Sequence, residues 1–352
     1  MISSTAQLED FLAAYNSSAA EKICAIDTEA DSLHRHKESL CLIQFTAGND
    51  CILIDPLAIK DLAPLDVYLK DATVWMHGAD YDMTMLKREF GRLPRHIYDT
   101  QIGARLLGVE KFGLGNLVEH YFGIVLSKSS QKADWGKRPL SPTMVEYALN
   151  DVRYLLEMGD KIVSKLKELD RYSWFLESCE SAKNKVEERD ESRDEAWRIS
   201  GAGKLSPYGL ACLRGLWHWR DKEAEAWDRP SFMVAPNRQL LEWCALMIDN
   251  KPIHLPHHFR ADRIKRFKKM QEAVRALSEN EWPTRPVGLR RKKDRLFDER
   301  VDALIAQRNK VANDLEIDGS LIASRAVIES IAANEAKPAD LLMKWQLKVL
   351  DL

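Results

Sequence analysis

The chain has 352 residues, of which 45% are hydrophobic and 30% are charged, and its formal net charge is −2. This length exceeds one average hydrophobic core and predicts two or three domains. The small net charge argues against nucleic-acid binding through global charge. No apolar run is long enough to span a membrane, and residues 1–16 show an amphipathic helical pattern rather than a secretory signal. Six cysteines form no CxxC pair, which favours reduced thiols and a cytoplasmic location.

Two carboxylates follow the first strand-like segment. Residues 23–26, Ile-Cys-Ala-Ile, show the pattern of a buried strand, and Asp27-Thr28-Glu29 comes directly after them. Side chains two apart in a strand project to the same face, so Asp27 and Glu29 are expected to point together. Carboxylates held so close repel each other unless a cation lies between them.

Further acidic residues lie on predicted helices. Ser141 and Pro142 form an N-cap and first-turn pair, and the helix they begin places Tyr147 and Asp151 one turn apart on one face. Asp82 begins another amphipathic helix just after the strand-like segment 73–76. Oxygen-only ligands suit Mg²⁺ or Mn²⁺. Carboxylates from three elements therefore predict a divalent-metal site with the arrangement that two-metal phosphoryl transfer requires.

Three ordered motifs carry a family resemblance. The runs AIDTEAD (25–31), HGADYDMTML (77–86) and DWGKRPLSPTMVEYALNDVRYLL (134–156) resemble the three exonuclease motifs of the DEDD superfamily, and most closely those of bacterial ribonuclease D. The flanking runs DTQIGARLLG and GLGNLVEHYFG match in the same order. The resemblance spans essentially residues 1–170.

The resemblance implies roles for individual residues. It assigns four acidic ligands of two Mg²⁺ or Mn²⁺ ions to Asp27, Glu29, Asp82 and Asp151. Tyr147 falls on the tyrosine that positions the attacking water. The histidine of the sister branch would stand at Glu146, so the chain belongs with the tyrosine branch. Each carboxylate taken alone would more often be solvated than catalytic, and it is the joint pattern that favours the metal site.

Residues near the motifs are candidates for substrate binding. Lys132 and Arg138 are candidate phosphate contacts. Trp135 is a candidate for stacking a base, with a core position as the equal alternative. Thr28 is expected either to donate to a phosphate or to fill a strand position, and His77 either to contact substrate or to be structural. Two further aspartates have structural interpretations: Asp99 is expected to be an N-cap and Asp55 a turn residue.

The pattern along the chain predicts three domains. Residues 1–198 alternate strand-like and helical segments, with a hairpin at Gly48-Asn49, and the resemblance implies a ribonuclease-H-like α/β fold with a mixed sheet. Residues 199–284 resemble an HRDC module, a small helical domain. Residues 285–352 resemble a second, diverged copy, with a generic helical bundle as the alternative. Between Phe259 and Arg295 stand thirteen Lys and Arg against five Asp and Glu, a local excess of eight that favours RNA contact over a merely solvated face.

The function expected from the resemblance is a metal-dependent 3′–5′ exoribonuclease that releases nucleoside 5′-monophosphates. Its expected partner is RNA with a single-stranded 3′ end, from tRNA precursors or other small structured RNAs, with no membrane and no obligate protein partner. One alternative is a DNA 3′–5′ exonuclease, which the HRDC-like modules and the absence of a polymerase region disfavour. The other is a non-catalytic RNA-binding scaffold, which the complete acidic set disfavours.

Overall fold

The computed structural model describes residues 1–16, 22–190, 192–284 and 295–352, which group into two compact units. Unit 1 contains residues 1–30, residues 40–189 and the described residues from 295 onward. Unit 2 contains Asp31–Ser39 and the described residues between 190 and 284. The described helices include none that is both long and apolar enough to cross a membrane.

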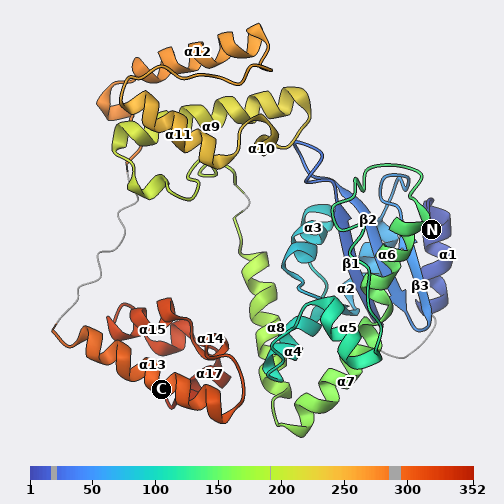
Figure 1. Ribbon diagram of the computed structural model, residues 1–352. Coiled ribbons are helices and arrows are strands. Elements are labelled where there is room, and N and C mark those ends of the chain that lie inside the picture. The colour runs from blue at the N-terminus through green and yellow to red at the C-terminus, as the bar shows by residue number, and fades with distance from the viewer. Residues whose placement is uncertain (17–21, 191, 285–294) are drawn as a thin grey trace. The chain divides into compact units, whose positions relative to one another are not determined.

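Unit 1 is built on a mixed sheet of five strands in the order β3-β2-β1-β4-β5 (Figure 1). The central strand β1 pairs antiparallel with β2 and parallel with β4, and β3 and β5 extend the sheet at either side. The predicted hairpin at Gly48-Asn49 is confirmed, since it joins β2 to β3. The strands are β1 (Ile23–Ala30), β2 (Leu40–Ala47), β3 (Asp50–Ile54), β4 (Thr73–Met76) and β5 (His96–Asp99).

Helices cover both faces of this sheet because both faces of β1 are apolar. Cys24 and Ile26 pack into a core with α1, α2 and α3, whereas Ala25, on the other face, packs into a core with α4, α7 and α8. The helices are α1 (Thr5–Asn16), α2 (Ala63–Lys70), α3 (Asp80–Phe90), α4 (Thr100–Leu106), α5 (Leu114–Phe122), α6 (Pro142–Arg153), α7 (Leu155–Glu168) and α8 (Tyr172–Glu187).

Helix α6 begins where the sequence indicates. The Ser141 hydroxyl accepts a hydrogen bond from the Met144 amide at 3.2 Å, and Pro142 occupies the first turn. The apolar periodicity that continues to Leu156 runs across two helices, because α6 ends at Arg153 and α7 begins at Leu155. Helix α7 lies against β4 at Gly159, where a Cβ atom would come within 2.9 Å of the Trp75 indole ring.

The C-terminal helices of unit 1 share its second core. Phe297, Ile322 and Trp345 lie in the same buried cluster as Trp75 and Phe175. The Trp345 ring also stacks on Trp174 of α8 with centroids 4.9 Å apart. These helices are α13 (Phe297–Asp314), α14 (Gly319–Ile322), α15 (Arg325–Ala332), α16 (Pro338–Leu341) and α17 (Lys344–Leu350).

Unit 2 is a small helical bundle around aromatic residues. Trp219 and Trp243 pack edge-on against Phe267, and all three are buried. Its α-helices are α9 (Pro207–Trp227), α10 (Ser231–Val234), α11 (Asn237–Ile248) and α12 (Ala261–Arg275).

The predicted fold class, an α/β exonuclease domain with a mixed sheet followed by helical domains, is confirmed. The three domain boundaries drawn from the sequence stay predictions. The two units also divide the chain in a way that sequence order does not suggest: the C-terminal helices group with the sheet, and the loop Asp31–Ser39 groups with the helical bundle.

Candidate active site

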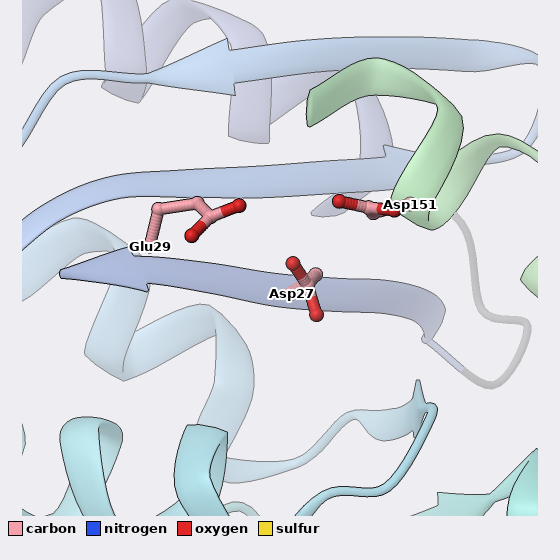
Figure 2. Close-up of side chains that lie close together, drawn as sticks. All are labelled: Asp27, Glu29 and Asp151. Atoms are coloured by element: carbon pink, nitrogen blue, oxygen red, sulfur yellow. The ribbon is translucent and has the colours of Figure 1, made fainter. Parts of the chain in front are cut away.

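Three carboxylates converge beside the central strand. Asp27 and Glu29 project from β1, and Asp151 projects from α6 toward them (Figure 2). One ligand oxygen from each of the three lies within 4.8 Å of the others. All three side chains are half-buried, so their charges are held close together and partly away from water.

This arrangement follows from the local structure. Side chains along β1 alternate between the two faces of the sheet, so Asp27 and Glu29 lie on the same face as Ala25. Helices α4, α7 and α8 cover this face around Ala25. Helix α6 contacts β1 and β2, and its start at Ser141 determines which of its residues face the sheet. Tyr147 and Asp151 share one side of α6, as their spacing of four residues requires.

The electrostatics of the cluster are unfavourable without a cation. Burial, followed by the charges of Asp82, Asp151 and Glu29, raises the pKa of Asp27 well above its usual value. Burial and the charges of Asp151 and Asp82 raise the pKa of Glu29 to about 9. Burial and the charge of Asp82 raise the pKa of Asp151 to about 7. Each raised pKa means that ionising the carboxylate costs more free energy here than it does in water.

Asp82 stands slightly apart from the three, at the first turn of α3. Its Oδ1 accepts hydrogen bonds from the Thr28 amide at 2.9 Å and from the Thr28 hydroxyl at 2.6 Å. Burial raises the pKa of Asp82 to about 7, and the two bonds from Thr28 lower it. Thr28 therefore orients Asp82 and leaves the other carboxylate oxygen for a further ligand.

Of the two roles expected for Thr28, this contact favours the structural one. Its side chain is 5% exposed and points to the face of β1 opposite Asp27 and Glu29. Its hydroxyl proton is donated to Asp82, so it has none to offer a phosphate.

Tyr147 lies at the edge of the cluster. Its hydroxyl hydrogen-bonds to Asp151, and burial together with the charges of Asp151, Glu29 and Asp27 raises the pKa of Tyr147. The phenol therefore stays protonated at physiological pH and can donate a hydrogen bond. A pocket of about 350 Å³ lies beside it, lined also by Ser127, Ser129 and Asn150.

The residues present fit divalent cations. The donor set is made of carboxylate oxygens, the ligands that Mg²⁺ and Mn²⁺ prefer. Burial and mutual repulsion together raise the pKa values of these carboxylates, and bound cations would offset both costs.

His77 follows β4 and is half-buried. Its Nδ1 lies 2.9 Å from the Thr100 hydroxyl, and that hydroxyl donates to the Met76 carbonyl. Thr100 must therefore accept from His77 Nδ1–H, which leaves Nε2 of the neutral ring as an acceptor. Burial lowers the pKa of His77, so the neutral form is favoured, although the nearby Asp99 opposes the shift.

Arg138 and Trp135 both find partners within the protein. All five N–H groups of Arg138 are used: by both oxygens of Asp55 and by the carbonyls of Trp135, Lys137 and Cys41. Trp135 is 2% exposed and packs near Tyr147 with ring centroids 6.0 Å apart. Trp135 thus occupies the core position that was its equal alternative, and the phosphate contacts expected of Arg138 and Lys132 stay predictions, with Lys132 exposed.

Two aspartates act as structural acceptors. Asp99 caps α4 by accepting from the Gln101 amide at 2.7 Å, as predicted, and it also accepts from the amides of Gly78 and Ala79 just before α3. Asp55 accepts from the Leu57 amide in a turn, as predicted, but its ion pair with Arg138 was not foreseen. No sequence signal joins two residues 83 positions apart.

Comparison with known proteins agrees with this geometry. Residues 1–167 match the family described as 3′-5′ exonuclease, and residues 209–251 match the HRDC domain. Ribonuclease D of Xanthomonas oryzae pv. oryzae is 30% identical over 340 residues, which cover 93% of this chain and 90% of that protein. The chain belongs to the ribonuclease D family.

Membership makes the chain a 3′–5′ exoribonuclease and implies the use of divalent metal. Ribonuclease D of Escherichia coli K12 is 35% identical over 210 residues, 58% of this chain and 55% of that enzyme. The crystal structure of Escherichia coli RNase D, described as an exoribonuclease involved in structured RNA processing, matches with a TM-score of 0.74 and 25% identity. That match covers 100% of this chain and 98% of the other, so the ribonuclease D architecture extends through the helical part.

Proposed function

We propose that this ribonuclease D-family enzyme removes 3′-terminal nucleotides from structured RNAs such as tRNA precursors, with Asp27, Glu29, Asp82 and Asp151 holding two Mg²⁺ or Mn²⁺ ions. The observation that carries the proposal is the convergence of Asp27, Glu29 and Asp151 within 4.8 Å, with pKa values raised by burial and by the neighbouring carboxylates. The products are nucleoside 5′-monophosphates. The cytoplasmic location inferred from the unpaired cysteines stays a prediction.

The chain's own residues divide the work of the reaction. When bound, the cations lower the pKa of a water and stabilise the departing 3′-oxygen. Asp27 and Asp151, whose carboxylates lie within 4.8 Å of each other, would hold the cations that offset the negative charge of the attacked phosphate. Tyr147, whose phenol stays protonated, would turn its one hydrogen bond from Asp151 to the attacking water and so orient that water. Asp82, aligned by Thr28, supplies its second oxygen from the side of α3.

Substrate contacts are proposed where donors or acceptors are free. His77 Nε2 is an acceptor and suits a ribose hydroxyl near the 3′ end, a group that distinguishes RNA from DNA. Lys132 is exposed and suits a phosphate. On α12, Lys265, Lys268 and Lys269 are also exposed and suit the RNA backbone, while residues 285–294 of the same basic stretch lie outside the described part.

The test of this proposal is hydrolysis of a 3′-tailed RNA with and without Mg²⁺, beside a matched single-stranded DNA. Asp151→Asn is expected to abolish release of nucleoside monophosphates while leaving thermal unfolding cooperative. Asp160→Asn, on an exposed carboxylate of α7, is the matched control and should retain parental turnover. Full hydrolysis in excess EDTA, or parental turnover by Asp151→Asn, contradicts the proposal.

The tyrosine is tested separately. Tyr147→Phe keeps the ring against Trp135 and removes only the hydroxyl, so RNA affinity should be unchanged. Positioned groups of this type contribute about 10²–10⁴-fold to rate, and a loss in that range is expected in single-turnover cleavage. A parental rate would make Tyr147 a packing residue.

A further inference from the structure

Unit 2 contains a small cationic pocket between α10 and α11. The pocket has a volume of about 370 Å³ and is lined by Arg35, His36, Arg220, Ser231, Phe232 and Asn237, among others. Of the lining residues in the described chain, none is acidic. Its wall also includes Ser32, which stands three residues after Glu29 in the chain.

The cation at the base of the pocket is Arg220, whose charge is buried. Its side chain is 5% exposed, and its Nη1 donates to the Ala235 carbonyl at 3.1 Å and to Asn237 Oδ1 at 2.7 Å, both uncharged groups. Its Nε has no hydrogen-bond partner among the described residues. Burial lowers the pKa of Arg220, although the nearby Asp221 opposes the shift. A buried guanidinium with an unused donor is costly unless an anion approaches it.

The other cations of the pocket are already engaged. Arg35 Nη1 lies 2.7 Å from Asp228, and His36 Nε2 lies 3.0 Å from Asp221. Asp221 also accepts from Arg193, so its charge is shared among several donors. These contacts tie the loop Asp31–Ser39 to the helical bundle, and they leave Arg220 as the group that gains most from a new anion.

A helix end adds to the positive potential. Helix α11 has twelve residues and starts after Pro236, and no side chain caps its first turn. The amides of that turn have no acceptor within the helix, and the helix dipole places partial positive charge there. Pro236 and Asn237 both line the pocket, so this helix end faces it. Uncapped amides beside a buried guanidinium are the donors that bind phosphate groups.

An aromatic side chain stands at the rim. Phe232 is 50% exposed, so part of its ring is open to a planar partner. Stacking of bases on exposed aromatic rings is a general means of holding single-stranded nucleic acid.

We infer that this pocket binds a backbone phosphate of the RNA substrate strand, with the adjoining base stacked on Phe232. The inference rests on the RNA substrate proposed above and adds a contact site outside the carboxylate cluster. The phosphate would accept from Arg220 and from the first-turn amides of α11, and Ser231 would lie beside it. The competing interpretation is that Arg220 only braces the loop between α10 and α11.

The experiment measures RNA affinity without cleavage. The full chain carrying Asp27→Asn, in EDTA, is titrated with a fluorescently labelled single-stranded 12-nucleotide RNA over a series of KCl concentrations, with anisotropy as the readout. Ser231→Glu places a carboxylate in the pocket and should weaken binding about tenfold or more. Loss of one phosphate contact should also make the slope of log affinity against log salt shallower by about 0.7.

Phe232→Ala tests the stacked base without adding charge. It should weaken binding about fivefold or more, with an unchanged salt slope. The matched controls are Ala245→Glu, which adds the same charge at an exposed position of α11 outside the pocket, and Met233→Ala, which truncates the exposed neighbour of Phe232. Both controls should stay within about twofold of the parent, and thermal unfolding confirms that each variant is folded.

Each result decides the inference. Parental affinity in both pocket variants overturns it and leaves Arg220 as a brace. Weaker binding by Ser231→Glu with an unchanged salt slope also overturns the phosphate contact. Cleavage of RNA by the chain with Asp27 restored is assayed separately, so failure of the pocket is distinguished from failure of the proposed function.

Discussion

At the scale of single residues, the charge of the carboxylate cluster makes metal binding and stability interdependent. The pKa of Glu29 is raised to about 9 and those of Asp82 and Asp151 to about 7, against about 4 in an unfolded chain. Between these values the folded chain holds more protons than the unfolded chain. The free energy of unfolding therefore falls as pH rises through this window.

We predict that the metal-free protein loses thermal stability between about pH 5 and pH 8, and that Asp27→Asn loses less over the same range, because one interacting charge is gone. Added Mn²⁺ should raise the melting temperature more at pH 8 than at pH 5, since the ligands must be deprotonated to bind it. Calorimetry of both proteins, with and without Mn²⁺, measures the difference. An identical pH dependence in the two proteins would mean that the cluster is solvated and unstrained.

Thr28 offers a second prediction at this scale, because its amide and its hydroxyl both donate to Asp82. Thr28→Val keeps the shape of the side chain and the hydrogen bond from the backbone amide to Asp82. It removes the 2.6 Å hydrogen bond that the hydroxyl donates. Groups that orient metal ligands typically contribute 10–100-fold to metal affinity or activity, and we expect a loss of about that size in Mn²⁺ affinity. Thr28→Ser, which restores the hydroxyl, should recover most of it.

That titration distinguishes orientation from packing. A purely structural role would lower the melting temperature of Thr28→Val and Thr28→Ser alike and leave the Mn²⁺ affinity unchanged. A direct contact between Thr28 and phosphate would instead change the RNA affinity measured in EDTA and leave the Mn²⁺ affinity unchanged.

At the scale of elements, Arg138 fastens the segment before α6 to the sheet. Its ion pair with Asp55, whose side chain is 4% exposed, connects that segment to the end of β3, and its bond to the Cys41 carbonyl connects it to β2. Trp135, which packs near Tyr147, lies within the same segment. The position of α6, and with it of Asp151, depends on this attachment.

We predict that Arg138→Ala destabilises the protein by about 3–5 kcal/mol, since it leaves the Asp55 carboxylate buried and unpaired. The double variant Arg138→Ala/Asp55→Ala should be less destabilised than the sum of the two single variants. Denaturant unfolding measures both. RNA affinity in EDTA should keep its salt slope, whereas a phosphate contact by Arg138 would make the slope shallower.

At the scale of the whole molecule, the packing of the C-terminal helices in unit 1 limits which truncations of the chain would leave a folded protein. The C-terminal helices share a core with Trp75 and Phe175, and the Lys344 and Trp345 amides donate to Glu177 of α8. Removing everything after about Lys204, the simplest design from the sequence, would expose that core. The contribution of the basic stretch to RNA binding is therefore better tested by point substitution of Lys265, Lys268 and Lys269 in the full chain.

Because the two units have separate cores, we predict two thermal transitions in calorimetry. Mn²⁺ should shift only the transition of unit 1, because unit 1 contains the four carboxylates proposed as its ligands. Trp345→Ala should lower that same transition, and Phe267→Ala, in the core of unit 2, should lower the other. A single transition that both substitutions shift equally would show that the units unfold as one.

Much of this protein could be predicted from its sequence, because short-range patterns carry the information. The apolar run before Asp27, the cap at Ser141 and the spacing of Tyr147 and Asp151 depend on neighbours within a few residues, and the strand and the start of the helix formed as expected. The ordered motifs also indicated the family. These features follow from strand alternation, helix periodicity and capping, which act locally.

Only the tertiary structure decided which polar groups meet across long separations. Arg138 pairs with Asp55, Thr28 donates to Asp82 across 54 positions, and the C-terminal helices join the core of the sheet. In each case the outcome depends on which desolvated donors and acceptors the folded chain brings together. A buried polar group must find a partner wherever the packing provides one, and no local pattern records where that is.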